Sequence, residues 1–424
     1  MRSEELKKLL MGGALRQYSE LYSDIDKQTK RMIGAIERFE ERFGKGRDVM
    51  LLSVPGRSEI AGNHTDHNRG KVMAGAIDRD IIAVAAKTDV GMIRFLSEGY
   101  PEDKVDLSQI DDPAQFKNYS SASLIAGVAK GIKNLGRKIG GYDAYATSEV
   151  LKGSGISSSA AYEVMIGNIL NHFYCSGKLS GVELAKVAQF AENEYFGKPC
   201  GLMDQMACAV GGFVYIDFNK EKYPIVEPID FSLTKAGYSL CIVNTGGNHA
   251  DLNDDYASVP AEMKSVAKLL GGDVLRGLTE EDLVKNLKNL RRLVGDRAIL
   301  RSLHFLRENE RVEKIRAALV AGDVPSFLSG VLESGRSSFE YLQNVYTTVN
   351  VKEQGLSLAL ALADGYLAGK GCAFRVHGGG FAGTIQVFIK NELIDGFVDL
   401  MDSVFGLGSA MTLRIRPLGA CRLF

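Results

Sequence analysis

Hydrophobic residues recur three or four positions apart in the first part of the chain and gather in short runs in many later segments. Between residues 4 and 45 the helical spacing, set among many charges, predicts an N-terminal helical arm. A mostly apolar run then predicts a strand at 48–54, which Pro55-Gly56 should end. The runs 81–88 and 92–97 flank a short Asp-Val-Gly turn and predict a β-hairpin.

Helical and strand patterns alternate through the rest of the chain without a repeat or a low-complexity linker. Helices are expected near 120–134, directly after a serine-rich loop at 153–159, near 181–196, and through most of 260–365. Strands are expected at 142–149, 211–218, 223–229, near residue 240, and on both sides of a glycine turn within 371–417. This pattern is typical of an α+β protein, and we expect two lobes that share a cleft, residues 1–235 and 236–424.

Charge and composition narrow the class of partner. The 51 Lys and Arg nearly balance the 52 Asp and Glu, so the chain lacks the positive field that holds nucleic acid, and a small or neutral partner is expected. The N-terminus lacks the apolar core of a signal peptide, and no stretch reaches the ~18 apolar residues of a membrane span, so we expect a cytoplasmic protein with no membrane partner. The six cysteines are scattered, which favours free thiols over disulfides or a zinc site.

Glycine is unusually frequent, with 47 of 424 residues, where about 7% is typical. The segment Gly153-Ser154-Gly155-Ile156-Ser157-Ser158-Ser159 places two glycines and several hydroxyls just before a predicted helix. Free backbone N–H groups and the positive end of the helix dipole at such a place favour a phosphate. The simpler alternative is a serine N-cap on a flexible turn. The spacing matches neither a Walker A loop nor the nucleophile elbow of serine hydrolases.

A second glycine cluster, Gly378 to Gly383, lies between two predicted strands. A two-residue turn would be enough for a hairpin there. Four glycines in six residues therefore indicate a close backbone approach, to a ligand phosphate or to another loop, although a tight structural turn would explain them as well.

Two further segments gather polar side chains. The segment from Pro55 to Gly70 crowds eight charged or amide-bearing residues after a buried strand, which suits a site that hydrogen-bonds a polyol. A solvated loop is the alternative, and a metal site built on His64 and His67 is the least favoured interpretation because it lacks a third ligand.

Asp204 stands among apolar residues and glycines, where it could cap the next helix or act as a base.

The segments GRSEIAGNHTD, GSGISSSAA, CGLMDQ and GGGFAG occur in this order along the chain. Together they resemble the motifs of the galactokinases, which belong to the GHMP small-molecule kinases, from about residue 50 to the end. The resemblance implies an α+β, two-lobed GHMP kinase fold with the active site between the lobes. It also implies ATP-dependent phosphorylation of the anomeric hydroxyl of galactose, with Mg²⁺, in a monomer or weak oligomer.

The matching motifs imply a role for each site residue. Asp204 resembles the catalytic aspartate, and Arg57 resembles the arginine that keeps it ionised and stabilises the transferring phosphoryl group. Residues 153–159 would wrap the ATP phosphates, with Ser159 and Glu192 as magnesium ligands. The positions that match sugar contacts are Asn63, His64, Asp66 and Tyr256.

The chain departs from the family pattern at three positions: Asn63 replaces a glutamate, His67 a tyrosine and His377 a threonine. Asparagine retains an acceptor oxygen but loses the charge and adds two donors, so the hydroxyl that this position contacts could be held differently. Galactose remains the expected substrate. The alternatives are a GHMP kinase for galacturonate, N-acetylgalactosamine or arabinose, and a catalytically silent sugar sensor, which the intact serine loop disfavours.

Overall fold

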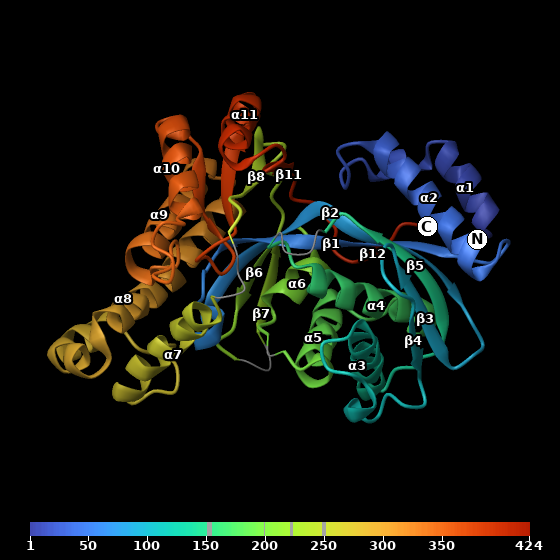
Figure 1. The fold of residues 1–424 in the computed structure, drawn as a ribbon, viewed down its shortest axis with the longest axis horizontal. Helices are drawn as coiled ribbons and strands as arrows, with labels where there is room; N and C mark the ends of the chain where they lie inside the picture. The colour runs from blue at the N-terminus through green and yellow to red at the C-terminus, as the bar shows by residue number, and fades with distance from the viewer. Residues whose placement is uncertain (151–154, 199, 221–223, 248–251) are drawn as a thin grey trace. The chain divides into compact units, whose positions relative to one another are not determined.

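The computed structural model describes residues 1–150, 155–198, 200–220, 224–247 and 252–424 (Figure 1). The chain forms two compact units, and each combines segments from distant parts of the sequence. The first unit comprises Met1–Arg57, Ala76–Gly212 and Arg416–Phe424, and the second comprises Ser58–Gly75 and Phe213–Ile415. The predicted division into lobes 1–235 and 236–424 goes by sequence position alone, and it stays a prediction.

The sheet of the first unit has helices on both faces. Figure 1 shows α1 (Ser3–Met11) and α2 (Ile25–Phe43) on one face, and α3 (Ser121–Asn134), α4 (Ser158–Tyr174) and α5 (Gly181–Ala191) on the other. The strand order is β12 (Cys421–Arg422), β1 (Met50–Ala61), β2 (Lys71–Lys87), β5 (Tyr142–Ser148), β3 (Met92–Ser97) and β4 (Asp103–Asp106). Alternate residues of β2, Ile82, Val84 and Ala86, pack against the two N-terminal helices. The predicted helical arm is therefore confirmed.

Two sequence predictions for this sheet are wrong. The runs 81–88 and 92–97 form strands but not a hairpin, because β5 lies between them, antiparallel to β2 and parallel to β3. The first strand does not end at Pro55, since β1 continues to Ala61. β12 pairs only with Leu52 and Ser53 of β1, so the missing N–H of Pro55 falls beyond that pairing and costs no bond to it.

The second unit is built on a mixed arrangement of helices around a smaller antiparallel sheet. Its strand order is β11 (Ala410–Leu413), β8 (Tyr238–Asn244), β10 (Thr384–Lys390) and β9 (Ala373–His377). α10 (Gly355–Leu367) and α11 (Ile394–Phe405) cover the face that carries Ile385 and Val387. α9 (Val324–Ser337) covers the opposite face, where Phe327 meets Phe388 edge to face at 5.0 Å.

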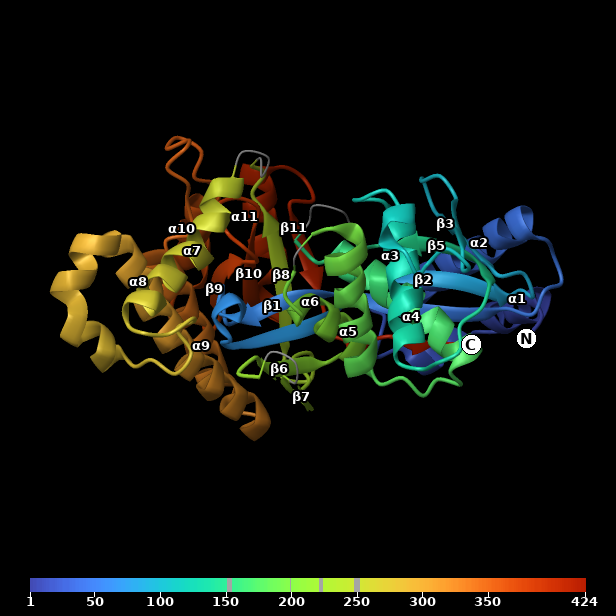
Figure 2. The same ribbon diagram turned by 90° about the horizontal axis from the view of Figure 1, so that it is seen from below.

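The remaining elements of the second unit extend it on either side. β6 (Phe213–Asp217) pairs with the start of β2 and with β7 (Ile225–Ile229), as the sequence predicts for the latter pair. α7 (Asn253–Leu269) packs along α8 (Glu280–Ala321), which breaks at Gly295. Figure 2 shows these helices from below. The α+β class is confirmed, and no helix within the described residues combines the length and apolar character that a membrane span needs.

Candidate active site

Arg57 and Asp204 form the centre of the candidate site in the first unit. Arg57 is carried by β1, and Asp204 lies in the first turn of α6 (Met203–Val210), where the helix dipole favours a carboxylate. The guanidinium binds the carboxylate through two bonds, Nε to Oδ1 at 2.7 Å and Nη2 to Oδ2 at 2.9 Å. Its Nη1 donates to the carbonyl of Gly155 at 2.6 Å. The pair that the sequence predicts is therefore brought together by a fork that fixes its geometry.

The environment keeps Asp204 ionised. Burial alone would raise the pKa of this carboxyl, but the positive charge and hydrogen bonds of Arg57, together with a hydrogen bond from Ser157, outweigh it and lower the pKa. The Arg57 side chain is 9% exposed and the Asp204 side chain 33% exposed. A substrate can therefore reach an anionic oxygen at this position.

The serine-rich loop touches the same pair. Ser157 holds a left-handed backbone conformation, φ 62°, and its hydroxyl donates to Oδ2 of Asp204. The carbonyl of Ile156 accepts from the Arg57 N–H at 3.1 Å, and a side chain at Gly56 would lie 2.7 Å from that carbonyl, so only glycine permits this approach. Gly153 and Ser154 lie outside the described residues.

The loop does not cap the helix that follows it. Ser157 is the residue before α4, yet its side chain makes no capping bond: its backbone is left-handed instead of extended as in an N-cap, and its hydroxyl points to Asp204, to which it donates. The alternative interpretation of the loop as a serine N-cap is therefore wrong. The first N–H groups of α4, from Ser158 and Ser159 onward, lack the intrahelical partners that later residues have, which suits an anion such as phosphate.

A buried pair of carboxylates lies beside the candidate catalytic pair. Gln205 follows Asp204, and its Nε2 donates to Glu192 at 2.8 Å and to Glu163 at 3.2 Å. Burial, and then the negative charge of Glu192, raise the pKa of Glu163 well above its usual range. Lys198 reaches Glu192 with its ammonium at 3.5 Å.

Glu192 of this pair fits a divalent cation. Glu163 and Glu192 are 0% and 2% exposed, and Oε1 of Glu163 has no hydrogen-bond partner among the described residues. A hard cation such as Mg²⁺ prefers carboxylate and hydroxyl oxygens, and Glu192 is one of the two ligands that the sequence predicts. Ser159, the other, stands one helical turn before Glu163 on α4. The chain thus offers suitable oxygens for the expected ion.

Asn63, the first of the predicted sugar contacts, is held entirely by the second unit. It is 1% exposed, and its amide nitrogen donates to Glu59 at 2.8 Å and to the carbonyl of Gly378 at 2.7 Å. Its amide oxygen accepts from Asn344 at 2.7 Å and from Ser338 at 3.4 Å. Both donors and the acceptor oxygen are therefore occupied by protein groups.

His64 and Tyr256 meet the predicted glycine turn. Nε2 of His64 lies 2.8 Å from the carbonyl of Gly379, and the Tyr256 hydroxyl donates to the carbonyl of Gly380 at 2.8 Å. Burial lowers the pKa of His64 to about 4, so the ring is neutral at pH 7 and Nε2, facing an acceptor, carries the proton. A side chain at Gly380 would lie 2.0 Å from the Asn344 carbonyl, which confirms the close approach to another loop.

Asp66 offers a carboxylate oxygen near this turn. Its Oδ1 accepts from the His67 N–H at 2.9 Å, and its side chain is 20% exposed. Oδ2 makes no hydrogen bond within the described part of the chain. Asp66 is therefore a predicted sugar contact with a free acceptor oxygen.

The residues that hold Asn63 in place were not apparent from the sequence. Nε2 of His304, on α8, donates to the Asn63 carbonyl at 2.9 Å, and Glu308 accepts from the Gly62 N–H at 3.0 Å. Arg375, on β9, donates to Glu59 at 3.4 Å and to the Ile60 carbonyl at 3.1 Å. These partners stand more than two hundred residues away in sequence, and no local pattern marks them. Gln205 and Glu163, by contrast, lie within or next to the motifs.

Comparison with known proteins identifies the family. The model for the GHMP kinases N terminal domain matches residues 123–212, and the model for the galactokinase galactose-binding signature matches residues 37–87. The galactokinase of Streptomyces coelicolor is 32% identical over 384 residues, covering 89% of this chain and 94% of its own. That of Chloroflexus aggregans is 32% identical over 392 residues, covering 89% and 93%.

Solved structures share the fold. The Lactococcus lactis galactokinase complexed with galactose superposes with a TM-score of 0.75 at 24% identity, covering 91% of this chain and 98% of its own. The Methanococcus jannaschii mevalonate kinase gives a TM-score of 0.61 at 15% identity, covering 87% and 98%. The Streptomyces coelicolor and Chloroflexus aggregans relatives, together with the matched family models, show that the chain belongs to the galactokinases, the sugar kinases of the GHMP kinase family.

Proposed function

We propose that the protein transfers the γ-phosphoryl group of ATP to the anomeric hydroxyl of galactose and yields galactose 1-phosphate and ADP. The observation that carries the proposal is the joint contact of Arg57, Asp204 and Ser157 at the start of α4. That contact puts an ionised carboxylate, a guanidinium and the N-terminus of a helix at one place, the groups that phosphoryl transfer requires. A catalytically silent sensor would have no need of this arrangement.

Asp204 is the residue we assign to the sugar hydroxyl. Its ionised carboxylate orients the attacking hydroxyl and accepts its proton as the new phosphorus–oxygen bond forms. Arg57 keeps that carboxylate anionic before the reaction and stabilises the charge that spreads over the phosphoryl oxygens during it. Ser157 holds Oδ2 in place, so that Oδ1 and Oδ2 present a fixed orientation to the substrate.

The start of α4 is the segment we assign to the ATP phosphates. Gly155 to Ser159 bring N–H groups and hydroxyls to the positive end of the helix dipole. Ser159 and Glu192 would hold Mg²⁺, which when bound neutralises phosphate charge. The ATP requirement fits the cytoplasmic location that the sequence predicts, and a monomer or weak oligomer stays the expected state.

A kinase for a related sugar is the second candidate, and one observation favours it. The amide of Asn63 is occupied on every side by protein groups, so it offers no hydrogen bond to a sugar hydroxyl. His64, Asp66 and Tyr256 are then left as the predicted sugar contacts. A hydroxyl that relatives hold through their glutamate would be held less firmly here, and sugars altered at that hydroxyl would be accepted more readily.

A substrate panel tests the proposal. Sugar-dependent ADP release is measured with galactose, galacturonate, N-acetylgalactosamine and arabinose at equal concentrations. We expect the highest kcat/KM with galactose. Turnover of another sugar with none of galactose would replace the substrate but keep the kinase, and no ADP release with any sugar would refute the activity.

A further inference from the structure

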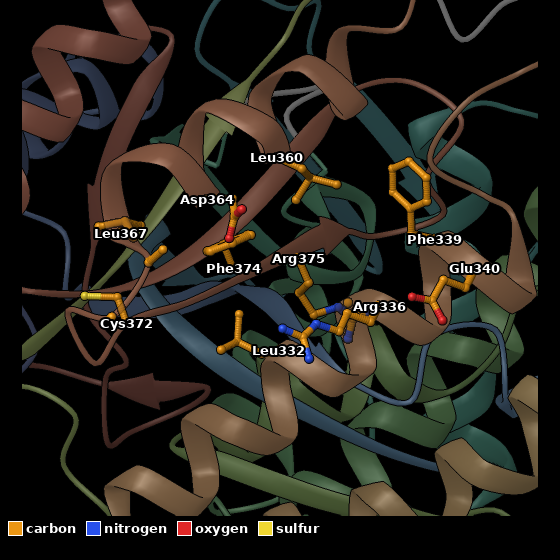
Figure 3. A pocket seen from close by; sticks show the side chains of 13 residues that line it. Leu332, Arg336, Phe339, Glu340, Leu360, Asp364, Leu367, Cys372, Phe374 and Arg375 are labelled. Carbon is orange, nitrogen blue, oxygen red and sulfur yellow. The ribbon is translucent and has the colours of Figure 1, made fainter.

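A pocket lies in the second unit, lined by residues of α9, the π-helical turn Ser338–Leu342 (η5), α10 and β9 (Figure 3). Its volume is about 410 Å³, within the ~300–1,000 Å³ of small-molecule sites. None of its lining residues belongs to the serine loop, the Arg57–Asp204 pair or the predicted sugar contacts. The pocket is therefore separate from the groups assigned to the reaction.

Two arginines line the pocket and both have hydrogen-bonding capacity left. Arg375 is 0% exposed, and its Nε has no hydrogen-bond partner among the described residues. Arg336, at the end of α9, is exposed and makes no ion pair or hydrogen bond within the described ranges. Figure 3 shows the two side chains directed toward the same part of the pocket. Two guanidinium groups that converge in this way suit a carboxylate.

The walls beside the arginines are apolar. Phe339 and Phe374 contribute rings, and Leu332 and Leu360 contribute aliphatic surface. Phe339 is 40% exposed and stands beside open solvent, so a ligand that covered it would bury apolar area. The pocket therefore suits a carboxylate that carries an apolar or aromatic body.

Two acidic side chains limit the charge of the ligand. Glu340 and Asp364 also line the pocket, and both are exposed. With two arginines and two carboxylates the lining has no net charge, so a nucleotide or another polyanion would meet repulsion as well as attraction. A single anionic group is the better match.

Arg375 links the pocket to the predicted sugar-binding segment. Its two terminal nitrogens donate to the Ile60 carbonyl and to Glu59, and Glu59 accepts from Asn63. The Arg375 side chain thus connects a ligand bound at its Nε to the segment that bears Asn63 and His64. A ligand that bonds Arg375 alters its bonds to Glu59 and to the Ile60 carbonyl and so changes the free energy of the segment, and the two binding events are then coupled reciprocally.

We propose that this pocket is an effector site for a small organic monocarboxylate with an apolar or aromatic body, held by Arg336 and Arg375, whose occupancy changes the affinity for the sugar. The binding part of the proposal is independent of the proposed function. Only the coupling part rests on galactose as the sugar, so a failure of one is distinguishable from a failure of the other.

The test compares carboxylates with their neutral amides. Benzoate, phenylacetate and phenylpropionate, each beside its primary amide, are titrated into the full-length protein by saturation-transfer NMR. We expect at least one carboxylate to bind about tenfold more tightly than its amide, and Arg336→Ala to weaken that carboxylate about tenfold, the change for one charge-assisted contact. Leu360→Trp, which fills the pocket and leaves both arginines, should also abolish binding.

The control variant is Arg292→Ala, which removes an exposed arginine of α8 that bonds Asn289 and lies outside the pocket. It should leave carboxylate binding unchanged. Galactose binding is then measured with and without the carboxylate that binds most tightly, and we expect its Kd to change at least twofold in the wild type and not in Arg336→Ala. Equal binding of carboxylates and amides, or a carboxylate Kd in Arg336→Ala equal to that of the wild type, would overturn the site. Carboxylate binding without a change in galactose affinity, where galactose itself binds, would overturn the coupling.

Discussion

Replacement of Arg57 by alanine tests the electrostatic core of the site. In the wild type, burial tends to raise the pKa of Asp204, and the charge and two hydrogen bonds of Arg57 more than reverse this. Without the guanidinium only the bond from Ser157 and more distant charges oppose burial. We therefore expect Arg57→Ala to raise the pKa of Asp204, to lower stability and to slow the reaction.

The magnitudes follow from the geometry. Removal of one partner from a buried ion pair costs about 3–5 kcal/mol, and we expect the lower end because 33% of the Asp204 side chain is exposed to water. Loss of one group that stabilises transition-state charge lowers kcat about 100- to 1,000-fold. ATP affinity should fall by much less, since the N–H groups of α4 remain.

The pH dependence has a definite sign. A carboxyl whose pKa is lowered on folding contributes stability above its unfolded pKa, about 3.9 for Asp, and loses that contribution as the pH falls through the folded pKa. The wild type should therefore exceed Arg57→Ala in unfolding free energy most at neutral pH and least in acid. The acid limb of the kcat profile should move to higher pH in the variant, because Asp204 must be ionised to act.

Urea unfolding at several pH values and steady-state kinetics measure these effects. Arg57→Lys is the matched variant: it keeps the charge but loses the fork, and it should fall between alanine and the wild type. A kcat within threefold of wild type in Arg57→Ala, or an acid limb at unchanged pH, would refute the assignment of Arg57 as the partner that keeps Asp204 ionised.

Four further substitutions probe the surrounding network. Asn63→Glu should lower the unfolding free energy, measured in urea, by about 2–3 kcal/mol, because it removes two donors and sets a second carboxylate against Glu59. It should not improve kcat/KM for galactose. An improved kcat/KM would contradict the conclusion that the Asn63 amide is occupied by protein groups. Glu192→Gln should raise the Mg²⁺ concentration for half-maximal ADP release at least about tenfold. Glu163→Gln should change that concentration less than twofold, since burial and the charge of Glu192 favour a neutral Glu163. A larger effect of Glu163→Gln than of Glu192→Gln would reverse the assignment of the ligand. Glu308→Gln should lower the unfolding free energy by about 3 kcal/mol at pH 7, because cationic neighbours overcome burial and lower the pKa of Glu308 from 4.5 to about 2. The difference in unfolding free energy from the wild type should shrink between pH 5 and 2. A pH-independent difference would show that the charge is not responsible.

The local sequence pattern predicts much of the fold, and the predictions that are wrong fail for a physical reason. Helical spacing marks the N-terminal helices, which bury one face, and short apolar runs mark most strands, since central strands such as β1 and β2 are buried on both faces. The hairpin prediction fails because strand pairing is decided by residues about fifty positions apart: β5 inserts between β2 and β3 with a register that no turn signal reveals. β1 passes through Pro55, which lies beyond the two residues that pair with β12.

Some residues of the candidate site could likewise be predicted from the sequence and others could not. Arg57, Asp204 and Ser157 stand in motifs, and the structure joins them directly. In the sequence Glu163 cannot be told from any other residue of the predicted helix. Its burial beside Glu192 in the folded chain marks it as part of the site. Arg375 reads as a strand residue, and its bond to Glu59 spans 316 positions, a contact that only the folded chain creates.

The central claim is that this chain phosphorylates galactose at the anomeric position with Asp204 as the group that activates the hydroxyl. The most direct measurement is phosphorus and proton NMR of the product formed from ATP, Mg²⁺ and galactose by the wild type and by Asp204→Asn. We predict a phosphate monoester coupled to the anomeric proton, formed in equal amount with ADP by the wild type and reduced at least 1,000-fold in Asp204→Asn, which should still bind ATP. A phosphate on any other hydroxyl, or undiminished product from the Asp204→Asn variant, would contradict the account.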